Sequence, residues 1–174
     1  MRQEKLILET SFSLHQKIIL IGFSLIPLMF IIELIEKRLN WKGYIFFIIA
    51  LLLFCYLISL AFSKKGLIKK NQKLYKAKFF KGIILFKQKI NLKDRPVVSI
   101  LKFKKSQKFA FFSAAKPDLG ESFNSFEIFI LNRTHYKRDS IMYFKKEESS
   151  QEAVKFLTND FPLKHEIFSP NHAR

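Results

Sequence analysis

The chain has 174 residues and a net charge of +17, with 31 lysine and arginine side chains against 14 acidic ones. Its length allows one modest domain beyond any anchoring segment. The single cysteine, Cys55, excludes an intrachain disulfide and a metal site built from cysteines.

Two long apolar runs follow a short N-terminal segment, residues 1–17. The first run, residues 18–35, carries one charged side chain, and the second, residues 43–63, carries none. A helix needs about 20 predominantly apolar residues to cross a bilayer. Residues 18–63 therefore predict a transmembrane helical hairpin, with spans at 18–35 and 44–62.

Two residues of the first run need an explanation in a membrane helix. Pro27 removes the hydrogen bond to the carbonyl of Phe23 and should kink the helix, and Ser24 or the second helix can offset the loss. An ionisable side chain within a membrane segment is a candidate for a functional role, and Glu33 is such a side chain. Because it lies near the end of the run, we interpret it as reaching the headgroups.

The orientation of the hairpin follows from its flanking basic residues. Ten of them lie at the two outer ends, and three lie in the intervening loop. The outer ten are Arg2, Lys5, Lys17, Lys64, Lys65, Lys69, Lys70, Lys73, Lys76 and Lys78, and the loop has Lys37, Arg38 and Lys42. The positive-inside rule places the N-terminus and the C-terminal domain in the cytoplasm, so we expect a protein of the inner (cytoplasmic) membrane.

After residue 64 the apolar pattern becomes that of an antiparallel sheet. Short segments rich in Ile, Phe, Val and Tyr predict strands near 66–70, 73–80, 83–91, 96–104, 108–114, 123–132 and 139–145, with a tight turn at Lys81-Gly82. Ser149 and Glu152 form a capping-box pattern at the start of a helix, and Val154, Leu157 and Phe161 give that helix one apolar face. The fold class is therefore α+β: the transmembrane hairpin, a mainly antiparallel β domain over residues 64–165 closed by a C-terminal amphipathic helix, and a tail over 166–174.

This order of elements carries a resemblance to a known family. The segments are GLIKKNQKLYKAKFFKGIILFKQKINL, VVSILKFKKS, FEIFILN, SIMYF and the terminal SSQEAVKFLTNDF. Together they resemble the bacterial pleckstrin-homology-like (PH-like) domains over roughly residues 64–165. The resemblance implies a strongly bent seven-stranded sheet capped by a helix, and several members carry a transmembrane hairpin before the domain. It implies no particular ligand residues, because the family has no invariant ligand motif.

No pattern for catalysis or for a cofactor stands out. The four histidines, His15, His135, His165 and His172, have no second histidine or cysteine three or four residues away. Phosphate-cradling loops and nucleophile elbows are also absent from the sequence. Asp118, Glu121 and Glu127 can pair as acid and base, but loop and strand-surface carboxylates are usually solvated. We expect no enzyme, no cofactor and no metal.

The uneven charge is the remaining signal. Residues 64–108 hold 16 basic side chains and one acid, whereas residues 1–63 hold 6 and 4 and residues 109–174 hold 9 and 9. Lysine clusters next to a membrane segment attract anionic headgroups. The candidate anionic-surface residues are Lys64, Lys65, Lys69, Lys70, Lys73, Lys102, Lys104, Lys105 and Lys108. In the alternative interpretation, the first cluster fixes topology and the others keep the domain soluble.

The sequence thus predicts a membrane-anchored binding or scaffold protein. Its basic cytoplasmic domain would contact anionic lipid headgroups or a membrane-protein partner. A membrane-tethered nucleic-acid-binding protein is the alternative, since Phe109, Phe111 and Phe112 follow the last lysine cluster and aromatic rings can stack on bases. Alternating phenylalanines in a strand more often belong to a core.

Overall fold

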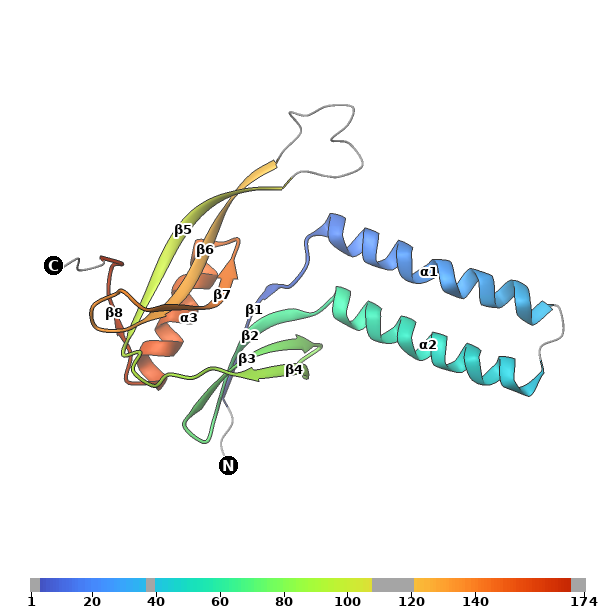
Figure 1. The fold of residues 1–174 in the computed structure, drawn as a ribbon, viewed down its shortest axis with the longest axis horizontal. Coiled ribbons are helices and arrows are strands. Elements are labelled where there is room, and N and C mark those ends of the chain that lie inside the picture. The colour runs from blue at the N-terminus through green and yellow to red at the C-terminus, as the bar shows by residue number, and fades with distance from the viewer. Residues whose placement is uncertain (1–3, 37–39, 108–120, 170–174) are drawn as a thin grey trace. The chain divides into compact units, whose positions relative to one another are not determined.

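The computed structural model describes residues 4–36, 40–107 and 121–169. In this part of the chain it is an α+β protein with three helices and two four-stranded sheets (Figure 1). It divides into two compact units, which we describe separately. The sheet unit comprises Met1–Glu9, Gly66–Lys76 and Gln88–Arg174, and the helical unit comprises Thr10–Lys65 and Ala77–Lys87.

The helical unit contains two long helices, α1 (Leu14–Glu36) and α2 (Trp41–Ala61). The start of α1 is a capping box: the Gln16 N–H donates to Ser13 Oγ over 3.3 Å, and the Ser13 N–H donates to Gln16 Oε1 over 3.0 Å. At the start of α2, Asn40 Oδ1 accepts from the Gly43 N–H over 3.2 Å. Both helices therefore begin at residues suited to that position.

Ser24 does not replace the hydrogen bond that Pro27 removes. The residues around Pro27 remain helical. The Ser24 hydroxyl donates to the carbonyl of Leu20, so of the two compensations expected, that by Ser24 is not found at the Phe23 carbonyl. Among the α1 side chains that the structure describes, Ser24 and Leu28 are buried. They border a small apolar cavity of about 160 Å³ that α2 also lines, through Ala50, Leu53, Phe54 and Leu57.

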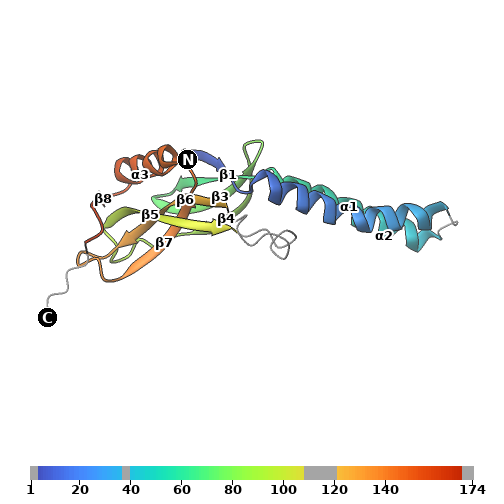
Figure 2. The ribbon, with the colours of Figure 1, turned by 90° about the horizontal axis from the view of Figure 1, so that it is seen from above.

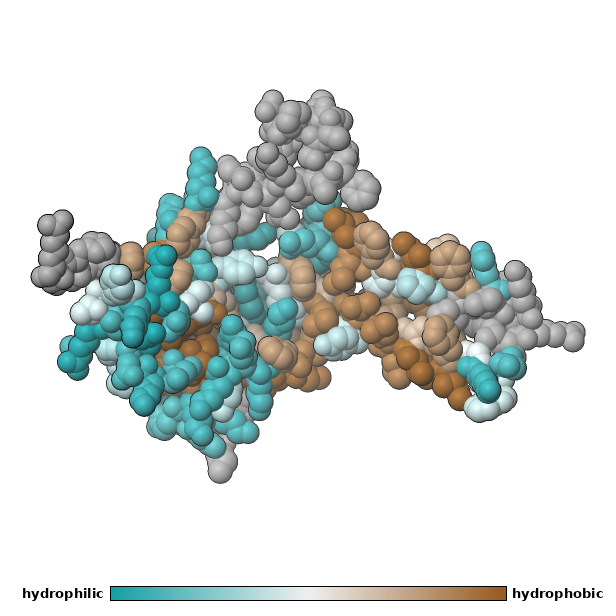
Figure 3. All heavy atoms as spheres, in the orientation of Figure 1, coloured by the Kyte–Doolittle hydropathy of each residue, from teal (hydrophilic) through white to brown (hydrophobic). Residues whose placement is uncertain are grey.

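Among the described residues, one helix has the length and composition of a membrane span, and it is α2. Of the two spans expected at 18–35 and 44–62, the second alone is found among the described residues. The apolar part of α1 that the structure describes, Leu14–Phe30, is shorter than a span. Its first turn carries polar side chains, and Glu33 and Glu36 lie in its last turns. Apolar side chains nevertheless cover both helices (Figure 3).

The first sheet has the order β1-β2-β3-β4. Its strands are β1 (Glu4–Thr10), β2 (Lys64–Lys70), β3 (Lys73–Phe80) and β4 (Ile83–Lys89). The last three were predicted, but β1 was not: the sequence assigned it to an N-terminal segment. Because β1 and β2 are neighbours, the helical hairpin is an insertion between two adjacent strands.

Two-residue turns with positive φ angles join β2 to β3 and β3 to β4. Asn71 and Gln72 have φ values of 51° and 58°, and Lys81 and Gly82 have values of 47° and 84°. Positive φ at both central residues is the geometry of a type I′ turn, whose twist matches that of paired strands. The predicted tight turn at Lys81-Gly82 is confirmed.

The second sheet has the order β7-β6-β5-β8. Figure 2 shows its strands from a second direction. Strands β5 (Val97–Gln107), β6 (Glu121–Leu131) and β7 (Arg138–Phe144) form antiparallel pairs, and β8 (Lys164–His165) pairs parallel to β5. The first three match predicted strands to within three residues. The strand predicted near 108–114 lies outside the described residues, and β8 was not predicted.

Helix α3 (Glu147–Asp160) begins earlier than the sequence indicated. Its N-cap residue is Lys146, whose side chain makes no capping bond, so the predicted capping box at Ser149 and Glu152 is wrong. The carboxylate of Glu9 in β1 instead binds the two residues that lead into the helix. It accepts from the backbone N–H of Lys145 over 2.9 Å and from that of Lys146 over 2.7 Å. A local pattern could not reveal a contact between residues 137 positions apart.

One core joins both sheets to α3 within the sheet unit. Its buried residues are Leu67, Leu74, Val98, Phe126, Ile128, Ile130, Ile141, Phe144, Ala153, Val154, Leu157, Phe161 and Leu163. The predicted apolar face of the terminal helix is confirmed, since Val154, Leu157 and Phe161 are all buried. Leu6 and Leu8 of β1 also pack against this core, so β1 is part of the domain.

Candidate functional site

Two of the predicted lysines, Lys102 and Lys104, are exposed on strand β5. Side chains two residues apart lie on the same face of a strand, so these lysines continue the face that Val98 and Ile100 direct into the core. The face changes from apolar to basic as β5 runs beyond the core. Lys102 and Lys104 pair with Phe126 and Asn124 of β6. We call Lys102 and Lys104 the strand cluster.

The surroundings of the strand cluster favour contact with an anion. The Lys102 ammonium lies 5.5 Å from the centre of the Phe126 ring. Among the described residues, no carboxylate forms an ion pair with either lysine. Uncompensated lysines beside one another repel, and an anionic ligand relieves that repulsion. Lys105 also belongs to β5, while Lys108 lies outside the described residues, as do Phe109, Phe111 and Phe112.

A second group of lysines surrounds the β2–β3 turn. Lys70 is half-buried and Lys73 is exposed, and in the described part of the chain neither forms an ion pair. Figure 1 shows this turn and the far end of β5 on opposite sides of the sheet unit. The structure therefore does not join these two predicted lysine groups into one patch.

Lys69 has a structural role instead. Its ammonium lies 2.7 Å from Asp160 Oδ1 at the end of α3 and 3.9 Å from Glu4 Oε2 in β1. The hydrogen bond to Asp160 raises the pKa of Lys69, and the charges of Asp160 and Glu4 add to this effect while burial opposes it. Lys69 thus links β2 to β1 and α3, and its ammonium is engaged by protein carboxylates and not by an external anion.

The first two lysines after α2 differ from each other. Lys64 is exposed, whereas Lys65 is 9% exposed and has an interaction partner. Lys64 directly follows the helix end at Phe62 and Ser63. Of this pair, Lys64 alone has the exposure that headgroup contact needs.

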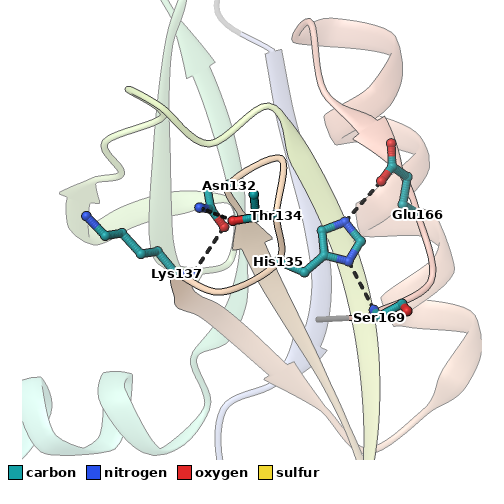
Figure 4. A network of polar contacts seen from close by, with 6 residues as sticks. All are labelled: Asn132, Thr134, His135, Lys137, Glu166 and Ser169. Atoms are coloured by element: carbon teal, nitrogen blue, oxygen red, sulfur yellow. Dashed lines mark hydrogen bonds and ion pairs between the residues drawn. The ribbon is translucent and has the colours of Figure 1, made fainter. Parts of the chain in front are cut away.

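His135 is the centre of a polar network that the sequence did not indicate (Figure 4). Its Nδ1 accepts from the Ser169 N–H over 3.0 Å, so Nδ1 carries no proton and Nε2 donates to Glu166 Oε2 over 3.0 Å. The imidazole is 6% exposed and stacks on Phe168 with 6.3 Å between ring centres. Both ring nitrogens are engaged by the protein. The network therefore holds the C-terminal segment at Glu166 and Ser169 against the β6–β7 turn.

Beside this network, three connections border an open depression of about 540 Å³. Its lining residues are Leu92, Asp94, Arg95, Pro96, Asn132, Arg133, Thr134, Pro162 and Leu163. Arg95 is held by Asp139, with Nε 2.8 Å from Oδ2. Asn132 shapes the β6–β7 turn by accepting from the Lys137 N–H over 3.0 Å and donating to Thr134 Oγ1 over 2.8 Å. Arg95 and Asn132, two polar residues of the depression, therefore stabilise the loops around it.

Metal-ligating side chains do not gather in the described ranges, where no group of three His, Cys, Asp or Glu could hold an ion. Comparison of the chain with protein-family models, with curated proteins and with solved structures finds no match. The strand cluster is therefore the candidate site on chemical grounds alone.

Proposed function

We propose that this chain is a membrane-anchored binding module whose basic domain contacts anionic lipid headgroups through the strand cluster. The domain would be PH-like and cytoplasmic. The order of the strands, two packed sheets and a closing amphipathic helix supports the PH-like assignment. The ten-to-three distribution of flanking basic residues supports the orientation.

The anchor would be a hairpin of two spans. α2 has the composition of a span, and α1 is a 23-residue helix, which at about 1.5 Å per residue is about 35 Å long. Phe23 and Phe30 of α1 are exposed, at 63% and 65%. Exposed phenylalanines suit contact with lipid. Both helices line one apolar cavity, so the second span would cross beside the first.

One observation carries the proposed function: the face of β5 that begins in the core ends in two exposed lysines that form no ion pair with a described residue. A lysine near an anionic membrane surface contributes about 1 kcal/mol. The pair would therefore contribute about 2 kcal/mol, or about a 30-fold change in affinity, and less as salt is added.

The test needs a domain without its hairpin. Ser11 and Ser63 lie side by side, since the Ser11 N–H donates to the Ser63 carbonyl over 2.8 Å. Replacing residues 12–62 with Asn-Gly should therefore rejoin β1 to β2. We expect this variant, once shown to be folded, to sediment with phosphatidylglycerol vesicles and not with phosphatidylcholine vesicles.

Neutralisation of the two lysines of the site is tested against a matched control. Lys102→Gln with Lys104→Gln should weaken vesicle binding about 30-fold. Lys155→Gln with Lys164→Gln removes the same charge from exposed positions elsewhere and should change binding much less. If both double variants lose vesicle binding equally, the cause is the net charge of the domain and not the position of Lys102 and Lys104.

A nucleic-acid binder or a protein scaffold would behave differently in the same experiment. Tighter binding to a single-stranded oligonucleotide than to anionic vesicles, lost in the Lys102 and Lys104 variant, would favour the nucleic-acid alternative. If the folded domain binds neither, a membrane-protein partner becomes the better interpretation. Cross-linking in native membranes would then identify it.

A further inference from the structure

The β3–β4 hairpin exposes apolar side chains at its tip. Ile83, which directly follows the turn, is 67% exposed, and Phe86 is 57% exposed. The two side chains are three residues apart in one strand, so they lie on opposite faces of the hairpin, and each face exposes a large apolar group. Lys81, in the turn itself, is exposed and lies over the Phe80 ring at 5.8 Å. The tip thus combines apolar and basic groups.

Acidic side chains are missing from this part of the sequence. Between Lys64 and Lys93 there is no aspartate or glutamate. A hairpin of this composition complements a surface that is anionic outside and apolar beneath. Lipid bilayers with anionic headgroups have this arrangement.

The hairpin belongs to the same compact unit as the two long helices. Residues Ala77–Lys87 group with Thr10–Lys65. The Lys78 ammonium lies 5.3 Å from the centre of the Phe12 ring, two residues before the start of α1. At the end of α2, the Phe62 ring lies 5.3 Å from the Lys17 ammonium. Aromatic and lysine side chains of this kind gather where a membrane helix meets the headgroups.

The level of the bilayer surface follows from these contacts. Since α2 ends at Ala61 and Lys64 already begins β2, the surface lies near Phe62. Phe12 is at the corresponding end of α1, because Ser11 and Ser63 are joined by hydrogen bonds of 2.8 and 3.1 Å. Lys78 touches Phe12, so β3 reaches the same level. The hairpin tip is only a few residues further along the chain.

We propose that the β3–β4 hairpin enters the headgroup layer of the bilayer that α2 crosses, with Ile83 and Phe86 against the upper acyl carbons and Lys81 on lipid phosphates. This inference rests on the membrane anchoring proposed above, but it does not depend on the strand cluster. The occupant is the lipid surface next to the anchor. The hairpin would be a third membrane contact, and it would limit the motion of the helical unit at the interface.

Tryptophan fluorescence of the full-length chain tests this insertion. Trp41 is the one natural tryptophan, so Trp41→Phe gives a silent background for Phe86→Trp, Ile83→Trp and the control Tyr136→Trp. Tyr136 is 73% exposed in the β6–β7 turn of the sheet unit. Each variant is reconstituted into vesicles of phosphatidylcholine and phosphatidylglycerol whose upper acyl carbons carry bromine. We expect emission from positions 83 and 86 to be quenched several-fold more than emission from position 136.

The two proposals can fail separately. The parent protein, with Trp41 at the start of α2, reports on the anchor. If bromolipids do not quench Trp41, the membrane anchoring itself is wrong. If Trp41 is quenched while positions 83 and 86 are quenched no more than position 136, the hairpin proposal is overturned. Blue-shifted but unquenched emission at position 86 also overturns it, because a protein surface would then cover the tip.

Discussion

Replacing Glu9 should destabilise the sheet unit although Glu9 is far from α3 in the sequence. Its two carboxylate oxygens accept from the N–H groups of Lys145 and Lys146 at 2.9 and 2.7 Å. These groups precede the first turn of α3, and no side chain of the helix caps them. Glu9→Ala would leave both N–H groups to water and remove a negative charge from the positive end of the helix.

The magnitude follows from the number and the environment of these bonds. A hydrogen bond to a charged group contributes about 1.5–3 kcal/mol when it is well shielded. Water can partly replace Glu9, because this site is at the surface. We therefore expect Glu9→Ala to lower the free energy of unfolding by about 2 kcal/mol, close to the upper end for loss of an N-cap.

Urea unfolding of the full-length protein in detergent, followed by circular dichroism, measures this change. Glu148→Ala is the matched control, since it removes an exposed carboxylate from the first turn of α3. Ser149→Ala should change stability by less than about 0.5 kcal/mol, the usual range for surface substitutions. The reasoning is refuted if Glu9→Ala unfolds like the parent while Ser149→Ala is destabilised, since the helix would then be capped locally.

Three further predictions concern the core, the topology and an ion pair. Leu157→Ala should cost about 2–5 kcal/mol in the same unfolding assay, because Leu157 is fully buried; parental stability would mean that α3 does not dock. A reporter active only outside the cytoplasm should be silent after Arg174 and active at Asn40, and the reverse pattern would invert the orientation. Stabilisation by Lys69 should be complete below its ordinary pKa of 10.5 and decline as pH rises through the raised folded-state pKa. Asp160→Asn should reduce that part of the pH dependence of unfolding, with Glu4 supplying what is left, and an unchanged profile would show that the Lys69–Asp160 ion pair contributes nothing.

Local patterns determined much of the architecture. The uncharged run at 43–63 indicated α2, because one side-chain property repeated over about 20 residues is enough to define a span. The strands after residue 64 and the apolar face of Val154, Leu157 and Phe161 were also predictable, since period-two and helical spacing are local signals. The lysines of the strand cluster were found in the same way.

Tertiary structure alone decided which distant segments meet. β1 pairs with β2 across the inserted hairpin, Glu9 binds the segment that leads into α3, and His135 binds Glu166 and Ser169. The tertiary structure also pairs Lys69 with Asp160, so this lysine has a structural role. Each of these contacts joins groups that are more than 30 residues apart or strands separated by two helices. Their partners follow from how the sheets and helices pack, and no spacing within a single segment encodes that packing.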